Sequence, residues 1–169
     1  MMDKLNLGLR GLQLFFIVIL TGLIGNVIAT NISAAASATA AINFAMFVIV
    51  LGWLTALYGI LSGVFVRVSY PVALLALDVS STLFSLICGI VLAAKLKAVN
   101  CADTKDHPSD WIAYGSADDS KRCRQIQAST AFMWFLFAGF TTSLVLSLMS
   151  FRRGGGSVRT GPTMSQIGV

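Results

Sequence analysis

Residues 71–96 read PVALLALDVSSTLFSLICGIVLAAKL, an apolar stretch long enough to cross a bilayer, with one acidic residue, Asp78, inside it. A transmembrane helix needs about 20 consecutive apolar residues, because no water in the hydrocarbon core can satisfy open backbone groups. Similar stretches lie at about 12–30, 40–66 and 128–151. The sequence therefore predicts an all-α membrane protein whose fold is a bundle of four transmembrane helices.

The composition excludes an ordinary water-soluble fold. Apolar residues make up 56% of the chain and charged residues 11%, against about 45–50% and about 25% in soluble domains. Twelve lysines and arginines outnumber seven acidic residues, which gives a net charge of +5. Because these basic residues do not alternate with aromatic residues on a soluble face, we expect no nucleic-acid partner. Beside apolar spans they are expected to meet anionic lipid headgroups.

The connections between the spans set the topology. Short links at 31–39 and 67–70 make consecutive helices antiparallel, and a long hydrophilic loop at 97–125 joins the last two. The 169 residues suffice for one domain, predicted at 1–151, followed by a flexible cytoplasmic tail at 152–169. A cleaved signal peptide is the alternative for the first span, although its apolar run exceeds the usual length of about 7–15 residues.

Cysteine use orients the bundle, since lysine and arginine divide evenly between the two sides. Arg10 counts among the basic residues on the side of the termini, ahead of the first span. Cys101 and Cys123 both lie in the long loop, and a disulfide between them is stable only in an oxidising compartment. We therefore expect the loop outside and both termini in the cytoplasm. Two unpaired thiols are the alternative.

Asp78 is the one acidic group inside a predicted span. A charged aspartate near a helix centre costs about 2.5–3.5 kcal/mol on membrane-insertion scales, so the side chain is expected to be neutral, hydrogen-bonded inside the bundle or part of a polar pathway. A structural role and a proton or ligand site are both open. Asp78→Asn should spare a scaffold and abolish the flux of a proton-coupled transporter. Candidate hydrogen-bond partners are Ser81, Thr82, Asn26, Asn43 and Tyr58.

Small residues recur four positions apart in the spans. The second span contains Gly59 and Gly63 as a GxxxG unit, and the third carries Ser81, Ser85 and Gly89. Such stripes let helices approach one another closely. We expect most of them to pack within the bundle, and a spare stripe to join copies of the chain into a homo-oligomer or to contact other membrane proteins.

Groups for catalysis are scarce in this sequence. The single histidine, His107, lies in the long loop, and no Cys/His, Ser/His/Asp or metal-ligand spacing is present. The sequence therefore predicts a protein that is not an enzyme, with no catalytic residue, no cofactor and no metal site.

Three motifs carry a resemblance to a known family. Residues 122–128 read RCRQIQA, residues 70–78 read YPVALLALD and residues 162–166 read PTMSQ. In these stretches, and in the order of its loops, the chain resembles the fungal non-classical export protein family, whose members carry a MARVEL domain. The similarity covers all four spans and is most specific at the first two motifs.

The resemblance implies a MARVEL-type bundle that organises a lipid domain of the plasma membrane, the eisosome compartment, and whose distribution responds to sphingolipid. Sphingolipid and anionic lipid are the partners this implies. The inner-leaflet contacts are predicted at Arg152, Arg153 and Arg159, where each charge near the surface contributes about 1 kcal/mol. The other functions considered are a small oligomeric proton-coupled transporter that uses Asp78, an accessory subunit of a larger membrane complex, and a factor in non-classical protein export.

Overall fold

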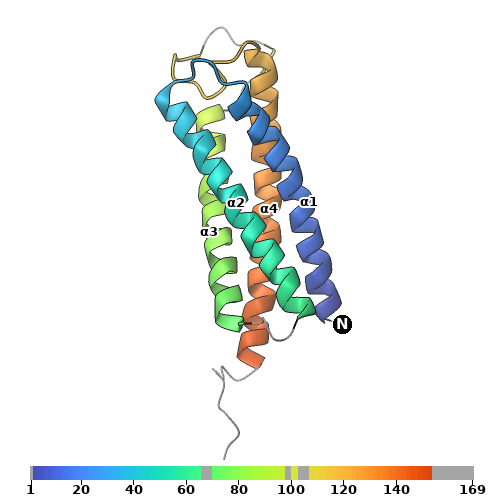
Figure 1. The fold of residues 1–169 in the computed structure, drawn as a ribbon. Helices are drawn as coiled ribbons and strands as arrows, with labels where there is room; N and C mark the ends of the chain where they lie inside the picture. The colour runs from blue at the N-terminus through green and yellow to red at the C-terminus, as the bar shows by residue number, and fades with distance from the viewer. Residues whose placement is uncertain (1, 66–69, 98–99, 103–106, 154–169) are drawn as a thin grey trace, which may run out of the picture.

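The computed structural model describes residues 2–65, 70–97, 100–102 and 107–153. These residues form four helices and no strand, which confirms the predicted all-α fold. Each helix is long and apolar enough to cross a membrane. The helices are α1 (Met2–Ala29), α2 (Ala36–Val64), α3 (Pro71–Leu96) and α4 (Asp119–Arg153), as Figure 1 shows.

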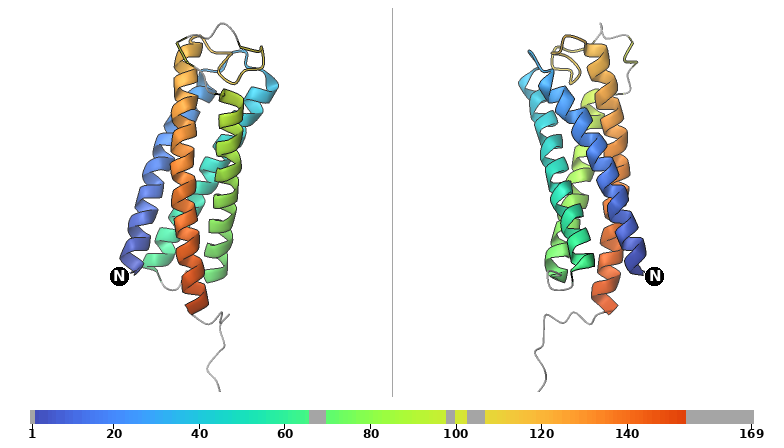
Figure 2. Two further views of the ribbon diagram at one scale, coloured as in Figure 1. Left: turned by 180° about the vertical axis from the view of Figure 1, so that it is seen from behind. Right: turned by 45° about the vertical axis from the view of Figure 1, so that its right-hand side comes forward.

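The helices run antiparallel to their neighbours around a four-cornered bundle (Figures 1 and 2). Contacts join α1 with α2, α2 with α3, α3 with α4, and α4 with α1, so that α1 and α3 face each other across one diagonal. The first residue of α1 and the last residue of α4 lie at the same end, which we call the terminal end. The connections that follow α1 and α3 lie at the opposite end, which we call the loop end.

Three helices begin earlier than the apolar runs indicate, α2 by a few residues, at Ala36 against about 40, and α1 and α4 by more. The spans were predicted from about 12 and 128, whereas α1 begins at Met2 and α4 at Asp119. At the start of α4 the Asp118 carboxylate accepts the backbone N–H of Lys121 (2.9 Å), a capping contact that hydropathy does not reveal. By contrast, α3 begins at Pro71 as predicted, because proline loses no intrahelical hydrogen bond in the first turn.

The last helix also extends past its predicted end. Arg152 and Arg153 belong to α4 and not to a flexible tail. The Arg152 side chain is exposed in this last turn. Arg159 and the rest of the predicted tail, 154–169, lie outside the described residues.

The core is apolar along most of the bundle. Ile17, Ile49 and Phe140 are among the fully buried side chains. Large apolar residues on the outside, such as Phe15 and Phe135, remain more than half exposed, as expected for side chains in contact with lipid. Because lipid is as apolar as these side chains, close packing and internal polar contacts hold such helices together more than the hydrophobic effect does.

A disulfide closes the loop end. Cys101 and Cys123 are bonded, with their Cα atoms 5.6 Å apart, and this bond ties the segment after α3 to the first turns of α4. The indole N–H of Trp111 donates to the carbonyl oxygen of Leu96 at 3.1 Å, which folds the loop back onto the end of α3. We call residues 30–35, 100–102 and 107–123 the loop cap.

Backbone contacts hold the α1–α2 link inside the loop cap. The carbonyl oxygen of Gly115 accepts the N–H groups of Ile32 (2.8 Å) and Ser33 (3.2 Å). Gly115 has a positive φ of 99°, and a Cβ there would collide with the backbone of Ala34. Only glycine fits both the dihedral angle and the space at this position.

Candidate functional site

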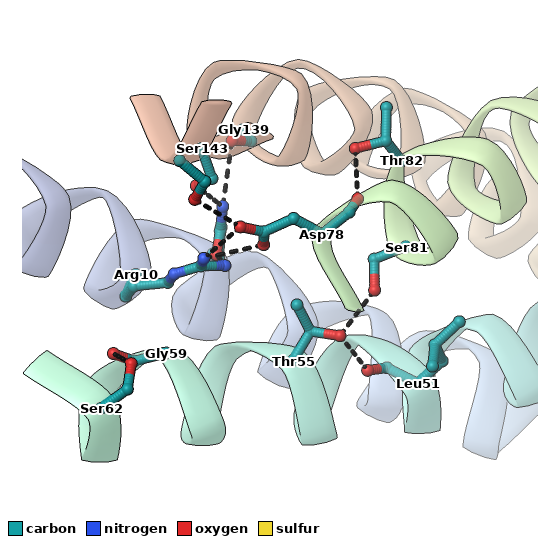
Figure 3. A network of polar contacts seen from close by, with 12 residues as sticks. Arg10, Leu51, Thr55, Gly59, Ser62, Asp78, Ser81, Thr82, Gly139 and Ser143 are labelled. Atoms are coloured by element: carbon teal, nitrogen blue, oxygen red, sulfur yellow. Dashed lines mark hydrogen bonds and ion pairs between the residues drawn. The ribbon is translucent and has the colours of Figure 1, made fainter. Parts of the chain in front are cut away.

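A buried ion pair crosses the diagonal of the bundle. The side chains of Arg10 on α1 and Asp78 on α3 are 1% and 0% exposed. One guanidinium nitrogen, Nη2, donates a hydrogen bond to Oδ2 of the carboxylate at 2.8 Å and lies at ion-pair distance, 2.7 Å, from Oδ1 (Figure 3). Because α1 and α3 are not neighbours, the long arginine side chain must cross the centre of the bundle to reach Asp78.

Polar side chains from α1 and α4 complete this site. The other terminal nitrogen of Arg10, Nη1, donates to Gln13 Oε1 at 3.1 Å. Gln13 Nε2 donates in turn to the carbonyl oxygen of Gly139 (3.0 Å) and to Ser143 Oγ (2.6 Å). The polar cluster, as we name it, consists of Arg10, Gln13, Asp78, Ser143 and Ser147.

Ser147 gives the carboxylate a second donor. Its hydroxyl donates to Asp78 Oδ2 at 2.9 Å, from the turn of α4 that follows Ser143. The carboxylate therefore accepts hydrogen bonds from α1, through the Arg10 guanidinium, and from α4, through the Ser147 hydroxyl. Asp78 is therefore paired and oriented from two sides of the bundle.

On α2, a glycine leaves room for the Arg10 side chain. A Cβ built on Gly59 would lie 2.9 Å from both Cδ and Cζ of Arg10, closer than real Cβ atoms approach. Gly59 is buried, and its backbone therefore forms the wall against which the guanidinium stem lies. All four helices thus meet around Arg10: α1 carries it, α2 makes room for it, α3 neutralises it, and α4 hydrogen-bonds its neighbours.

The energetics of such a site are asymmetric. Removing two charges from water is costly, and the pair recovers that cost only while both partners stay together. Removing one partner leaves an uncompensated charge and typically costs about 3–5 kcal/mol. Paired, Arg10 and Asp78 add no net charge to the interior, although the Nε atom of Arg10 and the Oδ1 atom of Asp78 have no hydrogen-bond partner.

The prediction that Arg10 precedes the first span, among the basic residues on the side of the termini, is wrong. The helix begins at Met2, so Arg10 lies inside it and is buried. A pattern in the sequence reveals this position. Residues three and four apart share a face of a helix. Arg10, Gln13, Ile17, Leu20 and Ile24 follow these intervals, and all of them are buried.

The predicted partners of Asp78 were also wrong in part. Ser81 pairs with Thr55 across α2 and α3 (2.7 Å), and the Thr82 hydroxyl donates to the backbone carbonyl of Asp78 (2.7 Å), not to its carboxylate. Asn26 and Asn43 belong to the halves of α1 and α2 nearest the loop end, away from Asp78. The Tyr58 hydroxyl accepts the backbone N–H of Tyr70 at 3.3 Å.

The predicted packing residues divide into two groups. Gly59, Ser81, Ser85 and Gly89 are buried in the bundle. A Cβ on Gly89 would lie 3.3 Å from the Trp134 ring of α4, so this glycine does bring two helices together. Gly63 is exposed, and a Cβ there would meet nothing within 4 Å. The GxxxG unit therefore does not act as one contact surface within the chain.

The structure also locates the predicted disulfide and one of the predicted inner-leaflet arginines. Cys101 and Cys123 are bonded within the loop cap, and Arg152 is exposed at the terminal end. Among the described residues, no group of three or more His, Cys, Asp and Glu side chains gathers as a metal site would require. The polar cluster, which lies among helix side chains and not in a loop, is the candidate functional site.

Four antiparallel apolar helices around a buried polar cluster define a multi-pass membrane domain. Residues 4–146 match the model of the MARVEL family, which is described as a membrane-associating domain. The chain is 31% identical to the Non-classical export protein 2 of Saccharomyces cerevisiae over 94% of this chain and 95% of that protein. It is 35% identical to the Non-classical export protein 102 of Candida albicans over the same shares of the two chains.

A second Saccharomyces cerevisiae protein, the Non-classical export protein 2 homolog 1, is 30% identical over 87% of this chain and 81% of its own length. No solved structure matches the chain at a significant level. This chain belongs to the MARVEL family and, within it, to the fungal non-classical export proteins.

Proposed function

We propose that this chain is a non-enzymatic scaffold that organises a lipid domain of the plasma membrane, of the eisosome type, and that its distribution responds to sphingolipid. Both termini face the cytoplasm in this proposal, and the loop cap faces the oxidising side, where its disulfide is stable. Copies of the chain, or other membrane proteins, assemble with it on its lipid-facing surfaces.

The burial of Asp78 and the contacts of its carboxylate are the main support for this proposal. An intramembrane acid that transports protons has to reach water and change its protonation state during a cycle. Asp78 is instead fully buried, and its oxygens lie against Arg10 and Ser147. Because Asp78 is buried against a counter-charge, a structural role that fixes one packing of the helices is favoured over a role as a proton carrier.

The terminal end supplies a contact to the inner leaflet in this scheme. Arg152 is exposed in the last turn of α4, directly beyond the apolar part of that helix. Arginines just cytoplasmic of a span attract anionic lipid, and each contributes about 1 kcal/mol. Arg153 and Arg159 follow Arg152 closely in the sequence and are proposed to act with it.

Imaging in living cells tests this proposal. The fluorescently tagged chain is followed before and after sphingolipid synthesis is blocked, beside a variant with Arg152→Gln and Arg153→Gln. The scaffold should move between patches and the wider membrane when synthesis stops, and the variant should form weaker patches. A uniform distribution that the block leaves unchanged would contradict the proposal.

A role in protein export is the second candidate. It is favoured by the names of three relatives, each called a non-classical export protein. Export of a leaderless reporter protein from cells that lack the chain distinguishes the two functions. Reduced export with normal lipid patches favours the export role, and normal export with lost patches favours the scaffold.

A further inference from the structure

A cleft of about 370 Å³ lies at the loop end, between the last turns of α3 and the loop segment that follows. Val91, Ala94 and Trp111 contribute apolar surface to this cleft. Among the described residues that line it, Lys95, Lys97 and Asp110 are charged. The cleft is far from the polar cluster, which lies toward the opposite end of the bundle.

Lys95 and Lys97 both line this cleft, and the helix ends between them. Residues two apart on a helix do not share a face. Lys97, however, has a positive φ of 62°, which is rare for a residue with a side chain, while its N–H still donates to Ala93 O at 2.9 Å. Both lysines therefore line one space.

The wall of the cleft is rigid at Trp111. Its indole N–H is held by Leu96 O, and the His107 ring stacks on it with 4.0 Å between ring centroids. Val91 and Ala94 lie within a membrane-spanning helix, whereas Lys97 follows its last residue. From Val91 to Leu96, the last residue of α3, the rise is about 7.5 Å, comparable with the headgroup layer of about 5–7 Å on each side of the hydrocarbon core. The cleft is therefore apolar at membrane depth and cationic at the surface.

From this arrangement we propose that the cleft binds the phosphodiester headgroup of a lipid in the leaflet on the loop side. Lysine ammonium groups bind phosphate as point charges. Of the cleft residues that the structure describes, two lysines and one aspartate sum to a charge of one positive, which matches a phosphodiester carrying one negative charge. Val91 and Ala94 would lie along an acyl chain, a contact that a free phosphate does not make.

This lipid site rests on the proposed scaffold function and adds lipid-binding residues on the outer side of the scaffold. The proposal assigns Lys95 and Lys97 to the phosphate. It assigns Asp110 a discriminating role, because its carboxylate disfavours lipids with more than one negative charge on the headgroup.

Lipid titration of the purified full chain tests the proposal. Phosphatidylglycerol is added to the protein in detergent, and the bound lipid is counted by native mass spectrometry. The variant with Lys95→Gln and Lys97→Gln should bind about thirtyfold more weakly, from two surface charges of ordinary strength. A matched control, Lys121→Gln with Arg124→Gln, removes two exposed charges elsewhere at the loop end and should stay within about twofold.

A variant that strengthens binding guards against a loss caused by misfolding. Asp110→Asn should tighten phosphatidylglycerol binding about fivefold, because a repulsive charge is removed. Either of two results would overturn the proposal. The lysine variant and its control could lose the same amount of lipid binding, or Asp110→Asn could bind the lipid more weakly than the parent chain. The titration contains no cells, so its failure is separate from a failure of the imaging test of the scaffold.

Discussion

The two ends of the bundle are held together by different means. At the loop end a covalent bond, backbone hydrogen bonds and a glycine turn tie the links to the helices. At the terminal end side chains do this work, through an ion pair between Arg10 and Asp78, 68 residues apart in sequence. Stability at the loop end is therefore spread over several contacts of different kinds, one of them covalent, whereas at the terminal end it depends on two charges that must meet.

The largest expected effect comes from breaking the ion pair on one side. Asp78→Asn leaves the Arg10 charge buried and unpaired, so the variant should lose about 3–5 kcal/mol of unfolding free energy. This replaces the expectation that Asp78→Asn would spare most of a scaffold's function. Reversible unfolding in mixed micelles measures the loss. A variant that unfolds like the parent would mean that the pair is dispensable.

Removing the disulfide should come next in size. Cys101 and Cys123 are 22 residues apart in the sequence. Replacing both by serine opens the loop that the disulfide closes and should lower the free energy of unfolding by about 3 kcal/mol. Because the disulfide and the ion pair lie toward opposite ends of the bundle, their losses should add in a combined variant. A strongly non-additive result would show that the two ends form one cooperative network.

The space beside Arg10 gives a smaller and more specific effect. Gly59→Ala places a methyl group against the guanidinium stem and should cost about 1–3 kcal/mol, as overpacking does. Gly63→Ala, four residues along on the same helix, is the matched control, because it meets nothing and should not destabilise. Thermal unfolding of the two purified variants checks this. Equal midpoints would count against a close approach of α2 to Arg10.

The smallest expected effect concerns Ser147. Its hydrogen bond to Asp78 should contribute about 0.6 kcal/mol, the average of such contacts between membrane helices, and unfolding of Ser147→Ala measures the loss. Ser80→Ala is the control, since the Ser80 hydroxyl donates only to its own helix, at Ala76 O. A loss at Ser147 that exceeded the loss at Asp78 would mean that the hydroxyl matters more to the bundle than the ion pair.

Much of the fold follows from the sequence alone. Hydropathy predicts the four spans, and the short links predict antiparallel neighbours. The extent of α1 does not follow, because a hydropathy boundary excludes a charged residue such as Arg10 that is buried with a partner. A search for the counter-charge that Asp78 requires, combined with the buried helical face of Arg10, Gln13 and Ile17, would have found the site.

Other parts of the site depend on three-dimensional packing. Ser143 and Ser147 are recognisable in sequence as small residues, but whether they line a helix interface or donate hydrogen bonds depends on which helices adjoin. Gly59 and Gly63 are equivalent in the motif and differ only because Arg10 crosses to one of them. Such differences arise from contacts between distant segments, which spacing along one helix does not encode.

The central claim is that Arg10 and Asp78 act as one neutral unit. A double-mutant cycle tests it most directly, with Arg10→Gln, Asp78→Asn and the variant that carries both changes, compared by unfolding free energy. The account predicts that the double variant is more stable than either single variant, because no unpaired charge remains in the bundle. Losses that simply add would contradict it.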